Sequence, residues 1–288
     1  MSQWFLTGCS GYVGSRLLSR AKSLDVNIHG LFRNSSQVEG ISSVIKGDLS
    51  CSPFPTVIKN GTSAVIHLAQ SNFYREFPAH AADITSVNVN ATALLLDQAV
   101  RSNAEAFIFA STANVYGSRP GFVAEEDSTS PDSFYAATKL AAEHLIQQYS
   151  RFIKIYILRI YTVYGPNQSG KLFDNIYKRI IADMPISLVG SGLQLTPIFI
   201  EDLVDIILEC SSGVLPPGVY NVCGNDALDL REISSSIARI CNKSLNIEQQ
   251  SGQPPRYCGS NAKLLSARNG LYLTSFEKGI KNLISEKM

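Results

Sequence analysis

Residues 4–18 read WFLTGCSGYVGSRLL, and this region near the start of the chain predicts its fold. Trp4-Phe5-Leu6 is a short apolar strand, and the residues after Gly14 continue as a helix. Between them, Gly8 permits a tight turn, Gly11 lets the backbone approach a pyrophosphate, and Gly14 allows the helix to pack closely on the strand. The phosphates then lie at the helix amino terminus. We expect a dinucleotide to be bound by Gly8, Ser10, Gly11, Tyr12, Val13 and Gly14.

The rest of the first half alternates short β-branched or aromatic runs with longer helical patterns. Strands are expected at 4–6, 26–32, 43–46, 64–68, 106–110 and 153–158, and helices at 11–23, 85–102 and 136–149. This alternation is typical of a parallel sheet with helices on both faces. The sequence therefore predicts an α/β fold with a Rossmann-type doubly wound parallel sheet.

The pattern changes after about residue 165. Helices are expected at 171–182 and 230–241, outside the main alternation, and residues 249–260 are irregular. We therefore assign 1–165 to a dinucleotide-binding domain and 166–288 mostly to a smaller C-terminal α/β substrate lobe. Because 219–222 reads as a late strand that returns to the sheet, the lobe is expected to be discontinuous in sequence.

Composition excludes several classes of partner. The chain has 288 residues, with 25 Lys and Arg against 24 Asp and Glu, so its net charge of +1 gives no reason to expect nucleic acid or an anionic membrane. Its six cysteines form no Cys-x-x-Cys pair, which indicates neither a metal site nor a disulfide framework. With no basic leader and no long apolar run, we expect a soluble cytoplasmic protein.

Tyr135 and Lys139 are the candidate acid/base pair. Four-residue spacing on a helix places them on one face. A phenol has a pKa near ~10, so it exchanges protons usefully at neutral pH only when a neighbouring cation stabilises its phenolate. The pair therefore predicts proton transfer at a site beside the bound dinucleotide.

Taken together, the motifs resemble the extended short-chain dehydrogenase/reductase family, which includes NAD(P)-dependent nucleotide-sugar epimerases, dehydratases and reductases. The resemblance covers nearly the whole chain, and its pieces occur in the family's order. After the glycine motif they are Gly47-Asp48-Leu49, Val65-Ile66-His67-Leu68-Ala69, Asn88-Val89-Asn90-Ala91-Thr92, Phe107 to Thr112, Val115-Tyr116-Gly117, Tyr135 to Lys139, Leu158-Arg159 and Val163-Tyr164-Gly165-Pro166.

The resemblance implies further cofactor contacts, with Asp48 expected beside the adenine. The residues implied are Asp48, Leu49, Leu68, Ala69, Ala110, Tyr135 and Lys139. Arg33 lies about twenty residues beyond the glycine motif, where a carboxylate would favour NAD and an arginine accommodates the 2′-phosphate of NADP. Arg33 therefore favours NADP(H), with NAD(H) as the alternative. His67, in the same strand as Leu68, is expected to be a hydrogen-bonded core residue rather than a base.

Thr112 completes the predicted catalytic set, because its hydroxyl falls at the end of the 106–110 strand, where such sheets bind ligands. The resemblance implies that Thr112 orients the reacting substrate oxygen, with Ser111 as the fallback for this role. Tyr135 then exchanges a proton with that oxygen, and Lys139 holds the nicotinamide ribose.

The resemblance leaves the reaction open. Family dehydratases follow the threonine with an Asp-Glu pair, but here Ala113-Asn114 follows Thr112, which disfavours dehydration. Because Arg33 favours NADPH, we expect reduction of a 4-keto-6-deoxy sugar nucleotide. The alternatives are a nucleotide-sugar 4-epimerase with tightly held NAD and a non-catalytic regulatory module that binds a dinucleotide.

The substrate site departs from the family pattern in two places. Thr162 stands where relatives carry a substrate-holding Asn, and the arginine that grips the sugar-nucleotide phosphates is missing before Glu201-Asp202. A replacement cation is expected among Lys171, Lys178, Arg179, Arg231 and Arg256. By analogy with the family, a homodimer would pair through the helix that carries Tyr135 and Lys139.

Overall fold

A computed structural model describes residues 2–33, 39–51, 54–190, 192–268 and 272–287. The chain divides into two compact units, and the segments of one alternate along the sequence with the segments of the other. The first comprises Met1–Val115, Thr129–Arg159 and Val204–Tyr220, and the second comprises Tyr116–Ser128, Ile160–Leu203 and Asn221–Met288.

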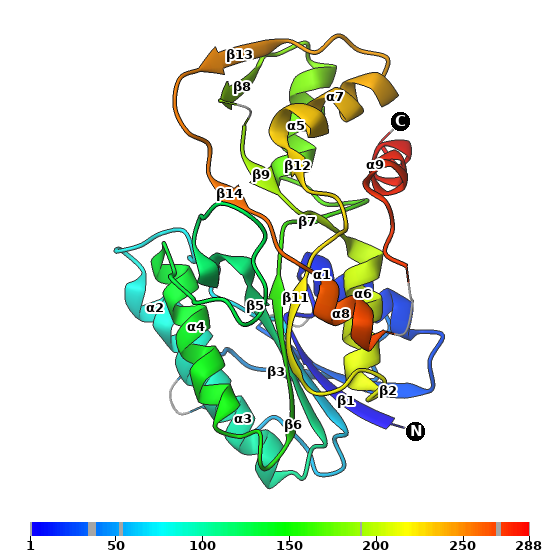
Figure 1. Ribbon diagram of the computed structural model, residues 1–288. Helices are drawn as coiled ribbons and strands as arrows, with labels where there is room; N and C mark the ends of the chain where they lie inside the picture. Colours follow the sequence, from blue (N-terminus) through cyan, green and yellow to red (C-terminus); the bar gives the residue numbers. More distant parts are fainter. Residues whose placement is uncertain (1, 34–38, 52–53, 191, 269–271, 288) are drawn as a thin grey trace. The chain divides into compact units, whose positions relative to one another are not determined.

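The frame of the first unit is a sheet of seven strands (Figure 1). In spatial order they are β11 (Gly218–Val222), β6 (Lys154–Ile160), β5 (Ala106–Thr112), β4 (Ala64–His67), β1 (Ser2–Thr7), β2 (Val26–Phe32) and β3 (Ser43–Lys46). β1 pairs in parallel with β2 and β4, β2 with β3, and β4 with β5. The order reverses between β1 and β4, which is where Rossmann-type sheets bind ligands at their carboxyl ends.

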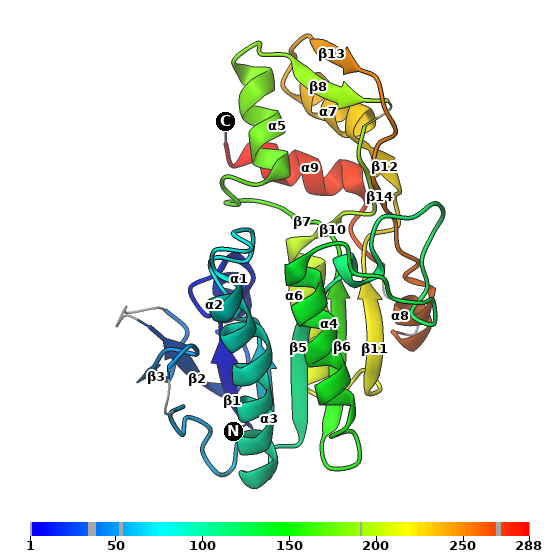
Figure 2. The same ribbon diagram turned by 90° about the vertical axis from the view of Figure 1, so that its left-hand side faces the viewer.

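Helices cover both faces of this sheet (Figures 1 and 2). α1 (Tyr12–Ala21) and α6 (Ile200–Ser211) lie on one face, and α3 (Ala91–Arg101) and α4 (Phe134–Gln147) lie on the other. The doubly wound α/β fold predicted from the sequence is therefore confirmed. The strands at 26–32 and 43–46 have their predicted bounds, and the other predicted elements of the sheet differ at their ends by a few residues.

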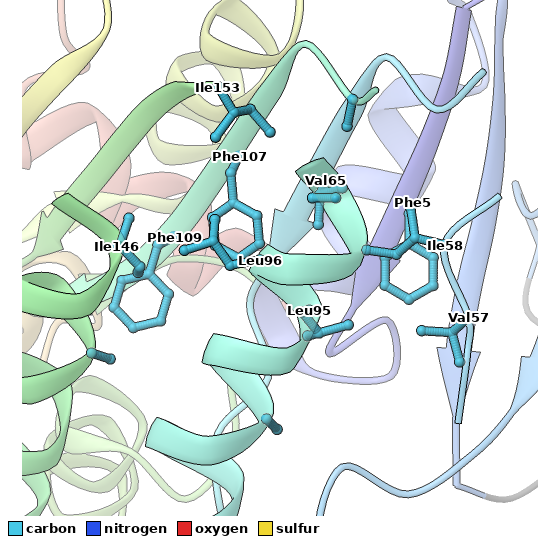
Figure 3. Close-up of a cluster of buried hydrophobic side chains, with 14 of the residues drawn as sticks. Phe5, Val57, Ile58, Val65, Leu95, Leu96, Phe107, Phe109, Ile146 and Ile153 are labelled. Atoms are coloured by element: carbon cyan, nitrogen blue, oxygen red, sulfur yellow. The ribbon is translucent and has the colours of Figure 1, made fainter. Parts of the chain in front are cut away.

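One hydrophobic core cluster of the first unit lies between the sheet and the helices α3 and α4 (Figure 3). Leu95 and Leu96 of α3 face Val65 and Phe107 of the strands, and all four side chains are buried. Burial of apolar side chains of this size contributes roughly 1.5–3 kcal/mol each. This packing holds α3 against β4 and β5.

The predicted helix at 85–102 differs from the structure in one respect. Helical conformation begins earlier, with α2 (Ala81–Thr85), and passes through a π-helix (Ser86–Asn90) before α3. Short π-helical segments occur frequently at functional sites because the extra residue in the turn redirects side chains. Here the π-helix carries Asn88, which is fully buried.

The described residues of the second unit form three small sheets. β7 (Val163–Tyr164) pairs with β10 (Ile198–Phe199), β8 (Ile186–Val189) pairs with β13 (Ile247–Gln250), and β9 (Gln194–Leu195) lies between β12 (Leu228–Asp229) and β14 (Arg256–Tyr257). Its helices are α5 (Leu172–Ile181), α7 (Leu230–Ile240), α8 (Ala262–Ala267) and α9 (Phe276–Ser285). Across the described part of the chain, the helices are too short or too polar to span a bilayer.

Aromatic packing stabilises the second unit. The Tyr164 ring stacks on Phe173 at a centroid distance of 4.8 Å and contacts Phe199 and Phe276 at 5.6 Å each. Gly279 of α9 sits against the same tyrosine, because a Cβ there would lie 2.3 Å from the Tyr164 hydroxyl. Tyr164 is thus a core residue of its unit.

Candidate active site

The glycine turn after β1 is shaped by close backbone contacts. Gly8 has a φ of +75°, and a Cβ at Gly8 would lie 2.8 Å from the backbone nitrogen of Ala69. A Cβ at Gly14 would lie 2.2 Å from the Gly8 carbonyl oxygen. Both glycines are therefore required by the packing of the turn against the end of β4 and the start of α1.

Gly11 is less tightly enclosed than Gly8 and Gly14. Among the described residues, the Gly8 carbonyl oxygen alone would meet a Cβ at Gly11, at 3.2 Å. Gly11 is the N-cap of α1, it forms no side-chain capping bond, and the first turn of the helix carries no acidic residue. Such a helix terminus presents backbone N–H groups and a partial positive charge to an anion. The turn is therefore suited to the phosphates of a dinucleotide.

A buried hydrogen-bond chain fixes the end of β4. The Thr92 hydroxyl donates to the Asn88 carbonyl oxygen, so it has no proton left for His67 and accepts from Nε2 of His67 at 3.0 Å. Nδ1 of His67 is then the acceptor nitrogen, and it accepts from the Thr7 hydroxyl at 2.7 Å. Burial, together with the charge of Lys139, lowers the pKa of His67 to about 3. His67 is thus a neutral core residue, as predicted, and it is unsuited to acid/base work at neutral pH.

The Tyr135 hydroxyl lies among three residues from separate parts of the first unit. It donates a hydrogen bond of 2.7 Å to Oε1 of Gln70, which follows β4. Burial and the nearby Tyr74 raise the pKa of Tyr135, while a hydrogen bond with Thr112 at the end of β5 lowers it. We call Gln70, Thr112 and Tyr135 the outer network. In the protein without ligands, the Tyr135 phenol is protonated at neutral pH.

Helix α4 begins with an N-cap at Ser133, whose hydroxyl accepts from the Ala136 amide at 3.2 Å. Tyr135 therefore lies in the first turn, and Lys139 lies one turn later on the same face, as the spacing predicts. Nζ of Lys139 donates to the Ala110 carbonyl oxygen at 2.9 Å and lies 4.7 Å from the Phe109 ring centre. Burial lowers the pKa of Lys139 to about 7, against an opposing effect of Glu143.

Glu143 lies one further turn along α4 and belongs to a second set of contacts. Its carboxylate accepts from Arg159 of β6, with the shortest distance 2.7 Å, and from the hydroxyl of Ser111. Ser111, Glu143 and Arg159 are all buried, and we call them the inner network. Because its hydroxyl donates to Glu143, Ser111 is less suited than Thr112 to orient a substrate oxygen.

The remaining predicted cofactor residues lie along the carboxyl edge of the sheet. Arg33 directly follows β2 and is exposed, and its neighbours 34–38 lie outside the described residues. The Asp48 carboxylate accepts from the backbone and hydroxyl of Ser50 at 2.9 and 2.8 Å, which closes a turn. The Leu49 side chain joins the core, whereas Leu68 and Ala69 are half-buried beside the glycine turn. Their roles toward a cofactor remain predictions.

The predicted substrate residues after β6 belong to the second unit. Thr162 precedes β7, and its carbonyl oxygen accepts from the Ile198 amide at 2.9 Å. Lys178 pairs with Asp174 at 2.8 Å, and Arg179 donates to the Pro185 carbonyl. Arg231 donates to Gln249, Arg256 donates to Gln194, and Lys171 is the N-cap residue of α5. Their roles toward a substrate remain predictions.

Sequence reasoning missed three polar residues that the structure brings to this site: Gln70, Asn88 as a hydrogen-bonding residue, and Glu143. Glu143 had a usable signal, because it continues the four-residue spacing of Tyr135 and Lys139. Gln70 had none, since its contact with Tyr135 joins residues 65 positions apart.

Comparisons with known proteins agree with the motifs. A model of the NAD dependent epimerase/dehydratase family matches residues 4–223. The uncharacterized UDP-glucose epimerase YtcB of Bacillus subtilis (strain 168) is 27% identical, over 97% of this chain and 96% of that protein. The dTDP-glucose 4,6-dehydratase of Streptomyces griseus is 24% identical, over 90% of this chain and 86% of that protein.

The fold also matches solved structures. The UDP-glucuronic acid 4-epimerase of Bacillus cereus, in complex with UDP-glucuronic acid and NAD, superposes with a TM-score of 0.83. It is 23% identical and the match covers 99% of this chain and 98% of that chain. The likeness therefore extends over nearly the whole of both chains.

Proposed function

Because the chain belongs to the NAD dependent epimerase/dehydratase family, within the extended short-chain dehydrogenases/reductases, we propose that it is a nucleotide-sugar 4-epimerase. Its substrate would be a UDP-linked hexose or hexuronic acid, and its cofactor a retained NAD. The observation that carries the proposal is the outer network, in which the Tyr135 hydroxyl donates to Gln70 at 2.7 Å and lies near Thr112 at the carboxyl end of β5. Family membership makes the protein an enzyme that acts on nucleotide sugars.

The first unit offers a suitable place for NAD. The uncapped start of α1, with Gly11 at its N-cap, would hold the pyrophosphate. Nζ of Lys139 uses one N–H on the Ala110 carbonyl, and its other N–H groups have no acceptor among the described residues, so they are available to ribose hydroxyls. Bound NAD would supply a hydride acceptor at the substrate carbon and a positive charge on its nicotinamide ring.

The chain's own groups would move and place the proton. Tyr135 would act from its phenolate form, which the positive charges of Lys139 and of bound NAD favour. It takes the proton of the sugar 4-hydroxyl as that carbon is oxidised, and returns it when the carbon is reduced from its other face. Thr112 donates its hydroxyl to the reacting oxygen and stabilises the negative charge that develops there. Its own oxygen is oriented by the Asn114 amide, which donates to it at 3.3 Å. Lys139 supplies a buried charge one helical turn away.

This proposal replaces NADPH-dependent reduction of a 4-keto sugar as the first choice. Similarity to the UDP-glucose epimerase and to the UDP-glucuronic acid 4-epimerase, the latter in complex with NAD, supports epimerisation and NAD. Arg33 keeps the reductase as a second candidate, because it is exposed directly after β2, where it would meet a 2′-phosphate. Dehydration is disfavoured, because Ala113 and Asn114 supply neither an acid nor a base after Thr112.

The test is a product assay with purified protein, NAD, and UDP-glucose or UDP-glucuronic acid. The proposal predicts formation of the 4-epimer without net accumulation of NADH. Steady consumption of NADPH with a 4-keto sugar nucleotide, and no epimer from either UDP sugar, would favour the reductase. Release of a 4-keto-6-deoxy product would identify a dehydratase. Tight binding of dinucleotide with none of these reactions would identify the regulatory module.

A further inference from the structure

We propose that Gln70 is a positioning residue of the active site, whose side-chain amide holds the Tyr135 hydroxyl in both of its protonation states. The inference rests on the proposed function, in which Tyr135 takes up and returns one proton. It adds a residue that the sequence motifs do not include.

The contact itself has the right chemistry. Oε1 of Gln70 accepts from the Tyr135 hydroxyl at 2.7 Å, and both residues are half-buried. A primary amide carries an acceptor oxygen and a donor nitrogen on one end, so it can accept from a phenol and, after rotation, donate to a phenolate. Carboxylates lack the donor, and apolar side chains lack both. The amide is thus suited to a hydroxyl that must cycle between two protonation states.

Hydrogen bonds hold the backbone on both sides of Gln70. The Ala69 amide donates to the Thr7 hydroxyl at 3.2 Å, and that hydroxyl belongs to the buried chain through His67. On the other side, the Ser71 amide donates to Oδ1 of Asn88 at 3.0 Å. Because both neighbouring amides are bonded to buried side chains, the position of Gln70 is fixed by the core rather than by the contact with Tyr135.

Asn88 also reaches the other partner of the contact. Its Nδ2 donates to the Thr138 hydroxyl at 3.1 Å, and this hydroxyl donates to the Tyr135 carbonyl oxygen at 2.8 Å. One buried amide, placed by the π-helix, therefore joins the segment that carries Gln70 to the helix that carries Tyr135. This explains why the fold accommodates a π-helical turn at this point.

The contact has a consequence for epimerisation. The phenol must stay in place while the oxidised sugar presents its other face, and during that interval it has no fixed substrate oxygen beside it. Gln70 supplies a permanent partner at that stage, complementing Thr112. We therefore expect Gln70 to affect turnover more than the affinity for the sugar nucleotide.

Other groups near Tyr135 set the background for any pH measurement. Tyr74 lies beside it, with ring centroids 5.2 Å apart, and Lys139 lies one turn along α4. Behind Lys139 are Glu143 and Arg159, which are paired and buried. None of these groups is altered by a substitution at Gln70.

Two variants test the proposal. Gln70→Glu keeps the shape but places a negative charge beside the phenol, so the tyrosinate titration of the NAD-bound protein should move upward by roughly one pH unit. Gln70→Met keeps the length but removes the hydrogen bond, so kcat should fall by roughly threefold to tenfold with a smaller change in KM. Tyr135→Phe provides the blank for the titration. Gln148→Glu, an exposed residue at the end of α4, is the matched charge control and should change neither quantity.

The titration reads the Gln70 contact directly and needs no sugar substrate, so it separates this inference from the proposed function. A missing epimer in the wild type would overturn the function alone. The inference is overturned if the tyrosinate titration of Gln70→Glu coincides with that of the wild type. It is also overturned if kcat in both variants stays within about twofold of the wild type, because the lost bond should exceed that effect.

Discussion

The inner and outer networks begin at adjacent residues of β5 and have opposite properties. Ser111 leads inward to Glu143 and Arg159, all of which are at most 6% exposed, and every charge there is paired. Thr112 leads outward to Tyr135 and Gln70, two half-buried neutral side chains. A closed ion pair holds its geometry but has no capacity left for a ligand. The neutral hydroxyls keep hydrogen-bonding capacity that a substrate oxygen can use.

Lys139 stands between the two networks on α4. Burial disfavours the charged form of Lys139, and Glu143 favours it. The inner network therefore helps to keep Lys139 positively charged next to the outer network. The contrast suggests a division of roles along one helix face. Tyr135 would perform the chemistry, Lys139 would hold the cofactor, and Glu143 would fix the helix to β5 and β6.

The largest effect is expected from the outer network. Tyr135→Phe removes the proton-transfer group without changing the ring, so turnover should fall by about a hundredfold to ten-thousandfold while NAD affinity stays nearly unchanged. Steady-state kinetics and a cofactor-binding titration measure the two quantities. Retained activity would remove Tyr135 from the mechanism.

Breaking the inner network should instead cost stability. Glu143→Gln leaves Arg159 buried without its counter-charge, which should lower the free energy of unfolding by about 3–5 kcal/mol in a denaturant titration. Replacing both partners, with Glu143→Met and Arg159→Met, removes the unpaired charge and should recover part of the loss. A single variant within about 1 kcal/mol of the wild type would show that the pair behaves like an exposed one.

A matched pair of truncations at the strand end sharpens the comparison. Thr112→Ala should lower kcat by about a hundredfold with little change in stability, because it removes a donor to the reacting oxygen. Ser111→Ala should lower the free energy of unfolding by about 1–3 kcal/mol, because it removes a partner of the buried Glu143, and should leave kcat closer to the wild-type value. If Ser111→Ala has the larger effect on kcat, the assignment of the two hydroxyls is reversed.

The smallest effect is expected at Arg33, outside both networks. Arg33→Asp should weaken binding of NADPH by about tenfold or more and leave NADH binding less affected, because the carboxylate repels a 2′-phosphate and accepts from a ribose hydroxyl. Fluorescence titration with each reduced cofactor measures the difference. Equal losses of affinity for NADPH and NADH would show that Arg33 does not contact the 2′-phosphate of NADPH.

The sequence predicts the frame of the site well because its signals are local. The glycine turn specifies backbone conformations within a few residues, and the spacing of Tyr135 and Lys139 on α4 follows from helix geometry alone. Thr112 is placed by the end of a strand whose apolar run is easily recognised. Each prediction depends on neighbours in the chain rather than on distant ones.

The parts that the sequence does not predict depend on contacts between distant segments. Gln70 reaches Tyr135 across 65 positions, and Ser111 donates to Glu143 across 32 positions because β5 packs beside α4. The π-helix around Asn88 breaks the 3.6-residue periodicity on which helix prediction relies. Tertiary hydrogen bonds stabilise that turn, and no local pattern records them.

The most direct test of the central claim follows a deuterium atom placed on C4 of the UDP sugar. If C4 is oxidised and reduced beside Tyr135 with a retained cofactor, the 4-epimer should keep the deuterium on C4 in ordinary water, as mass spectrometry would show. Replacement of that deuterium by hydrogen from water would contradict the account, because it would require C4 to exchange its hydrogen with solvent.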